Sequence, residues 1–166
     1  MPKTEDDLYE RFRALGIAWT THRHPPLRTV EESQRLSGDL PGGHCKNLFL
    51  KDKKDKLWLV VTLEAAPVDL KKLDKRIGSA RLSFGRPELL SEVLGVSPGA
   101  VTPFALINDA LQRVSPVLDA SMMRLPLLNY HPLHNEATTA IAAADLLAFV
   151  KSCGHRPQVL DVAGVE

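Results

Sequence analysis

The residues best suited to chemistry stand in a short run in the first third of the chain. Lys46 and Asn47 follow Gly42-Gly43 and precede the apolar run Leu48-Phe49-Leu50, which predicts the start of a buried strand. Glycines adopt backbone conformations that residues with a Cβ avoid. We therefore expect Lys46 where a mobile loop enters a rigid sheet, a position from which a cation can meet a ligand. A strand-end lysine with its ammonium in solvent fits the same residues.

Two later segments also carry residue types that bind ligands. Gly99-Ala100-Val101-Thr102-Pro103 is a run of small side chains, and its backbone amides could line a narrow pocket or bind an anion. The second segment, from Asn129 to Thr139, places His131 and His134 among polar neighbours. A plain loop explains the first segment equally well, and histidines more often hydrogen-bond the backbone or a substrate than hold a metal.

The histidines and cysteines do not form a convincing metal or nucleophile pattern. His131 and His134 are three residues apart, a spacing that serves a metal on a helix, but Pro132 argues against a helix there. No third ligand is evident, so we expect no metal. Cys45 would point away from Lys46 if both lie in one strand, and we interpret Cys45 and Cys153 as structural.

The elements that must position these residues alternate irregularly between helix and strand. Thr4 and Gly16 bracket the first helix, Pro87 and Gly95 bracket another, and a polar turn at 52–56 joins two strands into a hairpin whose second strand is buried on both faces. The remaining predictions are helices at 30–36 (capped by Thr29), 68–77 and 145–153, and strands at 17–24, 46–51, 57–63, 104–107, 114–119, 127–131, 137–141 and 159–162. Short strands mixed with helices favour a single α+β domain over 1–166.

Composition and charge narrow the class of protein. The chain has 166 residues, of which 44% are hydrophobic, and no apolar run is long enough to cross a bilayer. The acidic start lacks the features of a signal peptide, and two cysteines make no disulfide framework, so we expect a cytoplasmic protein. Residues 51–86 carry ten Lys/Arg against five Asp/Glu, although the whole chain is close to neutral. That segment is either a modest phosphate-binding face or a solvated hairpin tip and helix.

Three motifs in this order resemble one family. The run Lys46 to Leu50, the run Gly95 to Pro103 and the run His131 to Glu136 are similar to those of free-standing prolyl-tRNA editing proteins, relatives of the insertion domain of bacterial prolyl-tRNA synthetases. Within that superfamily the chain looks most like the branch that hydrolyses alanyl-tRNA(Pro). The resemblance implies a central, mostly antiparallel, curved sheet flanked by helices and a metal-free, cofactor-free hydrolase of aminoacyl esters acting in trans.

The resemblance also implies roles for individual residues. Lys46 is the expected catalytic residue, which holds a phosphate or polarises the ester as a point charge. Asn47 would orient polar atoms of the substrate. The remaining expected substrate-binding residues are Gly99, Ala100, Val101, Thr102, Pro103 and His131.

The expected partners and the alternatives follow from the same resemblance. The partner is the acceptor end of misacylated tRNA(Pro), with prolyl-tRNA synthetase as a transient partner and neither DNA nor a membrane. A deacylase for Cys-tRNA(Pro) or another misacylated tRNA would use the same lysine with a differently shaped pocket. A non-catalytic module that holds nucleic acid on the basic segment is a second class, and a homologue with a vestigial pocket is a third.

Overall fold

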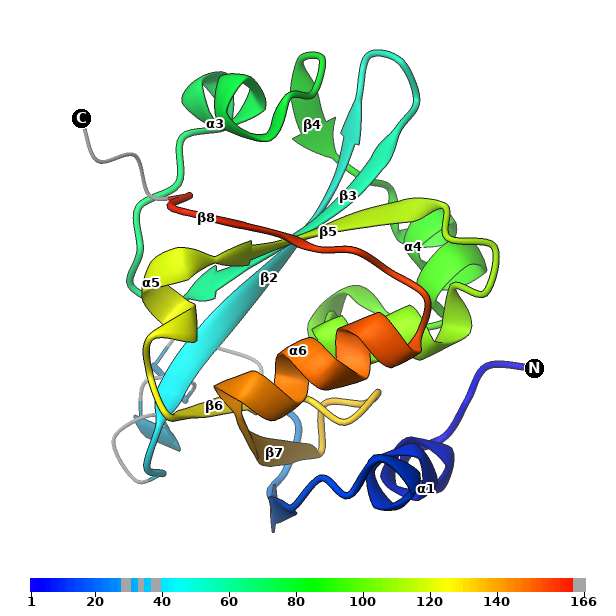
Figure 1. Ribbon diagram of the computed structural model, residues 1–166, viewed down its shortest axis with the longest axis vertical. Helices are drawn as coiled ribbons and strands as arrows, with labels where there is room; N and C mark the ends of the chain where they lie inside the picture. Colours follow the sequence, from blue (N-terminus) through cyan, green and yellow to red (C-terminus); the bar gives the residue numbers. More distant parts are fainter. Residues whose placement is uncertain (28–30, 33–34, 37–39, 163–166) are drawn as a thin grey trace.

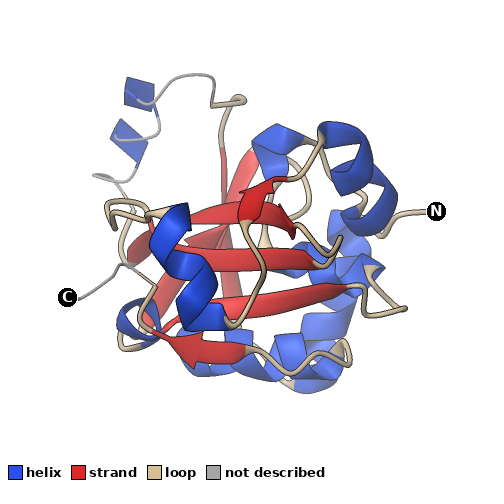
Figure 2. Ribbon diagram, turned by 90° about the horizontal axis from the view of Figure 1, so that it is seen from above, coloured by secondary structure: helices blue, strands red, loops and turns tan. Residues whose placement is uncertain are grey.

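The arrangement of the sheet decides where the site can form. A computed structural model describes residues 1–27, 31–32, 35–36 and 40–162. Eight strands form one mixed sheet in the order β1-β7-β6-β2-β3-β5-β8, with β4 paired to β2. In the described part of the chain, four of the strand pairings are antiparallel and three are parallel. Figure 2 shows the strands through the middle of the molecule and helices around them, and the predicted α+β class is confirmed.

Along the chain, the helices and strands closely follow the predicted order. The strands are β1 (Trp19–Arg23), β2 (Gly43–Asp52), β3 (Leu57–Leu63), β4 (Leu82–Phe84), β5 (Val114–Asp119), β6 (Leu127–Tyr130), β7 (Ala137–Ala142) and β8 (Gln158–Leu160). The helices are α1 (Glu5–Leu15), α3 (Leu70–Ile77), α4 (Pro87–Leu94), α5 (Ala120–Met123) and α6 (Ala143–Ser152), with 3-10 turns η1 (Pro98–Ala100) and η2 (Pro103–Asn108). The helix predicted at 30–36 and its cap Thr29 lie partly outside the described residues.

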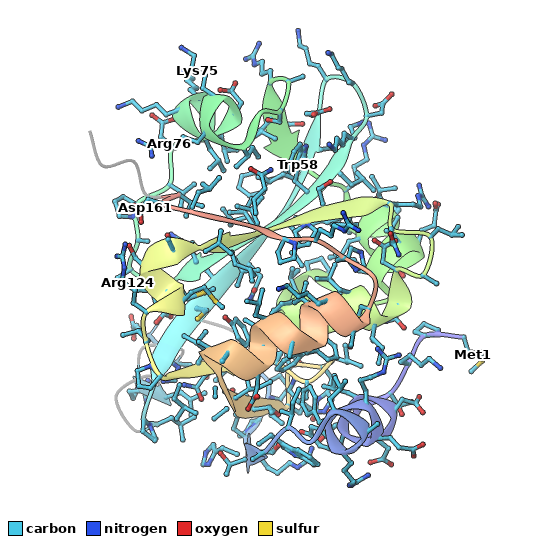
Figure 3. All side chains as sticks on the ribbon, in the orientation of Figure 1. Met1, Trp58, Lys75, Arg76, Arg124 and Asp161 are labelled. Carbon is cyan, nitrogen blue, oxygen red and sulfur yellow. The ribbon has the colours of Figure 1, made fainter. Side chains whose placement is uncertain are left out.

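Two hydrophobic clusters cover opposite faces of the central hairpin. Leu59 and Val61 of β3 pack with α1, α4 and α6, whereas Trp58 and Val60 pack with α3 on the other face. Successive side chains of a strand alternate between faces, so β3 is buried on both sides as predicted. Figure 1 places α3 at one end of the molecule and α1 at the other, and Figure 3 shows Trp58 in the interior near α3.

Three expectations about local structure need correction. The strand predicted at 104–107 is wrong, because these residues form the 3-10 turn η2, which starts at Pro103 and is capped by the Thr102 hydroxyl accepting from the Phe104 amide at 3.3 Å. The last helix begins at Ala143, two residues before the predicted Asp145. Lys46 does not stand at a loop–strand junction, because β2 already begins at Gly43.

The diglycine that precedes Lys46 is required by close packing. Gly42 has φ +95°, a conformation that side chains with a Cβ rarely adopt. A Cβ on Gly43 would approach the Leu125 side chain to 2.6 Å. These glycines therefore let β2 run closely beside β6, which is the contact that defines the site.

Candidate active site

A small crevice opens where β2 and β6 separate. The two strands run parallel and pair at only two positions, Gly43 with Leu128 and His44 with Asn129. Past these pairs lies a cavity of about 60 Å³, lined by Leu27, Leu36, His44, Cys45, Asn47, Glu64, Asn129, Tyr130, His131 and Thr138. This volume has room for a few water-sized groups.

Asn47 brings an unsatisfied acceptor to this crevice. Its side-chain oxygen Oδ1 has almost no accessible surface and accepts no hydrogen bond from the described residues. Leaving a buried acceptor unpaired costs about 1–3 kcal/mol, a cost that a ligand donor removes if a small movement of the side chain exposes the oxygen. Asn47 lies opposite Val61 in the β2–β3 ladder, on the face that packs with α1, α4 and α6. The carboxamide is therefore suited to accept from an ammonium or a hydroxyl.

His131 supplies a second acceptor. Its Nδ1 donates to the carbonyl oxygen of Ala137 at 2.9 Å, because a carbonyl can only accept. Burial lowers the pKa of His131, the bond to Ala137 raises it less, and the neighbouring His24 and His134 lower it further. The ring is therefore neutral at pH 7, and the Nε2 atom of this tautomer carries a lone pair that can accept a proton or a hydrogen bond.

Cys45 forms part of the wall without being a nucleophile. Burial raises the pKa of its thiol to about 12, well above the range in which a thiolate forms at neutral pH. Behind it the fully buried Tyr130 donates its hydroxyl to the sulfur of Met122 at 3.2 Å. The interpretation of Cys45 as structural agrees with this geometry, as does its position one residue before Lys46 on the opposite face of β2.

Lys46 lies between Cys45 and Asn47 on β2, on the same face of the strand as His44. Its ammonium donates to the carbonyl oxygen of Ala66 at 2.5 Å, just past the end of β3. Its cross-strand partner is Thr62, whose buried hydroxyl donates to Asp119 at 2.6 Å. Lys46 is not among the residues that line the crevice. The bond to Ala66 uses one of the three donors of its ammonium.

The loop from Gly99 to Pro103 lies against the segment that follows His131. A Cβ built on Gly99 would come within 3.2 Å of the Asn135 carboxamide. Ala100, Thr102 and Pro103 are buried. Val101 is half-buried and packs against the larger hydrophobic cluster. The structure thus brings Asn47 and His131 together in the crevice and places the Gly99 loop behind the His131 segment, while Lys46 does not line the crevice.

Comparison with known proteins assigns the chain to a family. Residues 24–149 match the family model of the aminoacyl-tRNA editing domain. The chain belongs to this family. The matched range contains both walls of the crevice, with Asn47 from β2 and His131 from the end of β6.

Relatives of this editing domain are similar over nearly their whole length. The chain is 38% identical over 156 residues to prolyl-tRNA synthetase associated domain-containing protein 1 of Danio rerio, covering 93% of this chain and 85% of the relative. It is 34% identical over 149 residues to the prolyl-tRNA editing protein ProX of Acetoanaerobium sticklandii, covering 89% and 91%. The resemblance to prolyl-tRNA editing proteins is confirmed.

The fold also recurs in solved structures. A structure described as "a putative trans-editing enzyme for prolyl tRNA synthetase" superposes with a TM-score of 0.74 at 20% identity, covering 99% of each chain. In the described ranges of this editing domain, no three His, Cys, Asp or Glu side chains are grouped to hold a metal ion, and no helix is long and apolar enough to cross a membrane.

Asn129 and Thr138 line the crevice and lie in the segment singled out from the sequence, although neither was named as a site residue. Asn129 donates its amide to the carbonyl oxygens of Pro41 and Gly43, at 2.9 and 3.2 Å, and so ties the start of β2 to β6. The hydroxyl of Thr138 on β7 lies 2.8 Å from Nε2 of His24, which follows the neighbouring strand β1. The sequence could have indicated that Cys45 lines the crevice, because strand alternation puts it on the same face as Asn47.

Proposed function

We propose that this editing domain hydrolyses the ester of misacylated tRNA(Pro), with alanine as the preferred amino acid. Family membership supports editing of prolyl-tRNA in trans, and the relatives named for prolyl-tRNA editing support the choice of tRNA. The observation that carries the proposal is the pair of polar side chains, the Asn47 carboxamide and the His131 imidazole, on the wall of a crevice of about 60 Å³.

The size of the crevice supports alanine over larger amino acids. The aminoacylation site of a synthetase that is shaped for proline discriminates by only about 1–3 kcal/mol against an amino acid that lacks a few methylenes. A second site that admits only small residues is therefore needed. The few groups that fit the crevice match a methyl side chain with its ammonium. The same argument makes Cys-tRNA(Pro) the next candidate substrate.

The two acceptors suggest how the reaction proceeds. Asn47 accepts from the ammonium of the amino acid and holds the ester in place. His131 Nε2 accepts a hydrogen bond from the attacking water or from the free ribose hydroxyl and orients it. Water adds to the ester carbonyl carbon, the bond to the ribose oxygen breaks, and that oxygen takes a proton. The products are free alanine and the tRNA with its terminal hydroxyl restored.

Lys46 and the Gly99 loop complete the proposal. Lys46 would exchange its bond to Ala66 for a phosphate of the terminal nucleotide, since its four-carbon stem is flexible. The segment from Gly99 to Pro103 limits the depth of the site from behind the His131 segment. A transient complex with prolyl-tRNA synthetase would present the mischarged tRNA.

Deacylation assays on defined substrates test this function. Ala-tRNA(Pro), Cys-tRNA(Pro) and Pro-tRNA(Pro) are each incubated with the protein, and the expected order of rates puts alanine first and proline last. Lys46→Ala, Asn47→Ala and His131→Ala should each lower the deacylation rate by a factor of about 100 or more. Removal of one polar group from an active site typically lowers the rate by about 10²–10³. Lys151→Ala, on the exposed surface of α6, is the matched lysine control and should keep full activity.

The outcomes distinguish the remaining classes. Full activity of Lys46→Ala would remove Lys46 from the mechanism. Salt-dependent binding of tRNA without hydrolysis would instead favour a binding module that uses residues 51–86, where Lys75 projects from α3 into solvent (Figure 3). Faster hydrolysis of Cys-tRNA(Pro) than of Ala-tRNA(Pro) would make Cys-tRNA(Pro) the preferred substrate.

A further inference from the structure

Glu5 connects the first helix to the segment that carries His131. Its carboxylate accepts from the guanidinium of Arg23 at 2.7 Å and lies 2.5 Å from Nε2 of His134. These two partners come from β1 and from the segment after β6, and His134 lies 129 positions away in the chain. The Glu5 side chain is only 14% exposed, although it stands in the first turn of a surface helix. Such convergence indicates a structural tie between distant elements.

His134 transmits this tie to the neighbouring backbone. Its Nδ1 accepts from the amide of Glu136 at 3.1 Å, so Nδ1 carries no proton and Nε2 must donate to Glu5. The contact is therefore a hydrogen bond from a neutral ring to a carboxylate. The carbonyl of Glu136 in turn accepts from the amide of His24 at 3.1 Å.

The next residue along the chain orients His131. The carbonyl oxygen of Ala137 accepts the hydrogen bond from His131 Nδ1 at 2.9 Å. Residues 134–137 are thus fixed at Glu5 on one side and orient His131 on the other. A displacement of this segment would turn the imidazole, because the carbonyl of Ala137 is the partner that sets its tautomer.

The segment also needs an external tie because its backbone is strained. Leu133, between the two histidines, has φ +75°, in the left-handed region that residues other than glycine avoid. Such conformations persist only where the surroundings over-determine them. Leu133 packs against the hydrophobic cluster, and the Glu5–His134 bond holds the residue next to it.

We propose that Glu5 is a positioning residue of the site, which acts through His134 on the segment that orients His131. This inference rests on the proposed deacylation. The alternative role for Glu5 is that of an ordinary acidic residue in the first turn of a helix, where negative charge is favourable. Asp6 occupies the same turn and is exposed, so it shares that electrostatic role without the contact to His134.

A set of matched variants separates the two roles. Glu5→Ala removes both charge and acceptor, Glu5→Gln removes only the charge, and Asp6→Asn removes an equal charge from the same turn. We expect Glu5→Ala to lower kcat for Ala-tRNA(Pro) roughly tenfold to a hundredfold with little change in KM, the range that a misplaced catalytic group produces. Glu5→Gln should retain most of the activity because its amide oxygen still accepts from His134, and Asp6→Asn should retain all of it.

A double variant and a spectroscopic readout complete the test. His134→Ala should lower kcat as Glu5→Ala does, and the double variant should be no slower than either single one. The ¹⁵N chemical shifts of the His131 ring should change in Glu5→Ala and stay unchanged in Asp6→Asn. This NMR measurement does not depend on enzymatic activity. Unchanged kcat and unchanged His131 shifts in Glu5→Ala would overturn the inference. If the unaltered protein hydrolyses none of the substrates, the proposed function fails and the His131 shifts alone decide the role of Glu5.

Discussion

Two histidine–carboxylate pairs in this molecule have the same chemistry and different surroundings. His155 Nε2 lies 2.9 Å from Asp109 Oδ2, and both side chains are 2% exposed. His134 pairs with Glu5 at the surface, where the side chains are 36% and 14% exposed. The first pair is enclosed by protein, whereas the second lies beside the site and in partial contact with water. Under the proposal above, the buried pair serves the fold and the surface pair adjusts the site.

The buried pair organises the entry to a central strand. Asp109 also accepts from the backbone amides of Arg113 and Val114, each at 2.9 Å, and so fixes the turn that leads into β5. His155 reaches this turn from the segment that follows α6. Asp109 is thus held by three donors from two parts of the chain, and its loss would leave all three without a partner.

The largest expected effect comes from breaking the buried pair. Asp109→Ala should lower the free energy of unfolding by about 3–5 kcal/mol, the range for removing one partner of a buried pair. Urea denaturation followed by circular dichroism measures this value. The activity of the folded fraction should stay close to normal, because Asp109 does not line the crevice. A loss below 1 kcal/mol would mean that the two pairs do not differ as burial suggests.

An intermediate result is expected from breaking the surface pair. His134→Ala should cost about 1 kcal/mol of stability or less, as for other partly exposed pairs, while kcat falls. Denaturation and deacylation measured on the same preparation give both values. The two variants should therefore rank in opposite orders, because Asp109→Ala loses more stability and His134→Ala loses more activity. Equal rankings would contradict it.

The smallest expected effect is a pH dependence of stability that comes from the Glu5 carboxylate of the surface pair. Burial alone would raise the pKa of Glu5, but hydrogen bonds from Arg23, His134 and Tyr9 lower it from 4.5 to about 2. Because the folded pKa is the lower one, the stabilisation is complete above about pH 4.5 and is lost as pH falls towards 2. The melting temperatures of the unaltered protein and Glu5→Gln should therefore differ at pH 6 and converge near pH 2. A constant difference would show that the Glu5 carboxylate contributes nothing through its charge.

Much of this organisation could be predicted from the sequence, since local patterns determine local structure. The buried hairpin and the helix ends at Gly16 and Gly95 follow from apolar runs and left-handed caps. The apolar run at 104–107 misled the prediction because a short buried run does not by itself distinguish a strand from a 3-10 turn, and Pro103 with Thr102 started the turn.

The site was less predictable because it depends on contacts between distant elements. The motifs identified Asn47 and His131, and the strand alternation that separates Cys45 from Lys46 also separates Asn47 from Lys46. No local pattern could indicate that Glu5 meets His134, because the contact depends on how α1 packs beside β1 and β7. Long-range ties of this kind are where a single sequence carries the least information.

The two-pair connection between β2 and β6 has a consequence for how the domain opens. Among the described residues, the strand ladder between the β1-β7-β6 part of the sheet and the β2-β3-β5-β8 part consists of Gly43–Leu128 and His44–Asn129 alone. We expect the amide hydrogens along this short ladder to exchange faster than those of the β2–β3 hairpin. A molecule bound between Asn47 and His131 would span both parts and slow the exchange of each. The substrate would then act as a temporary cross-link of the sheet, and amide protection would report its occupancy.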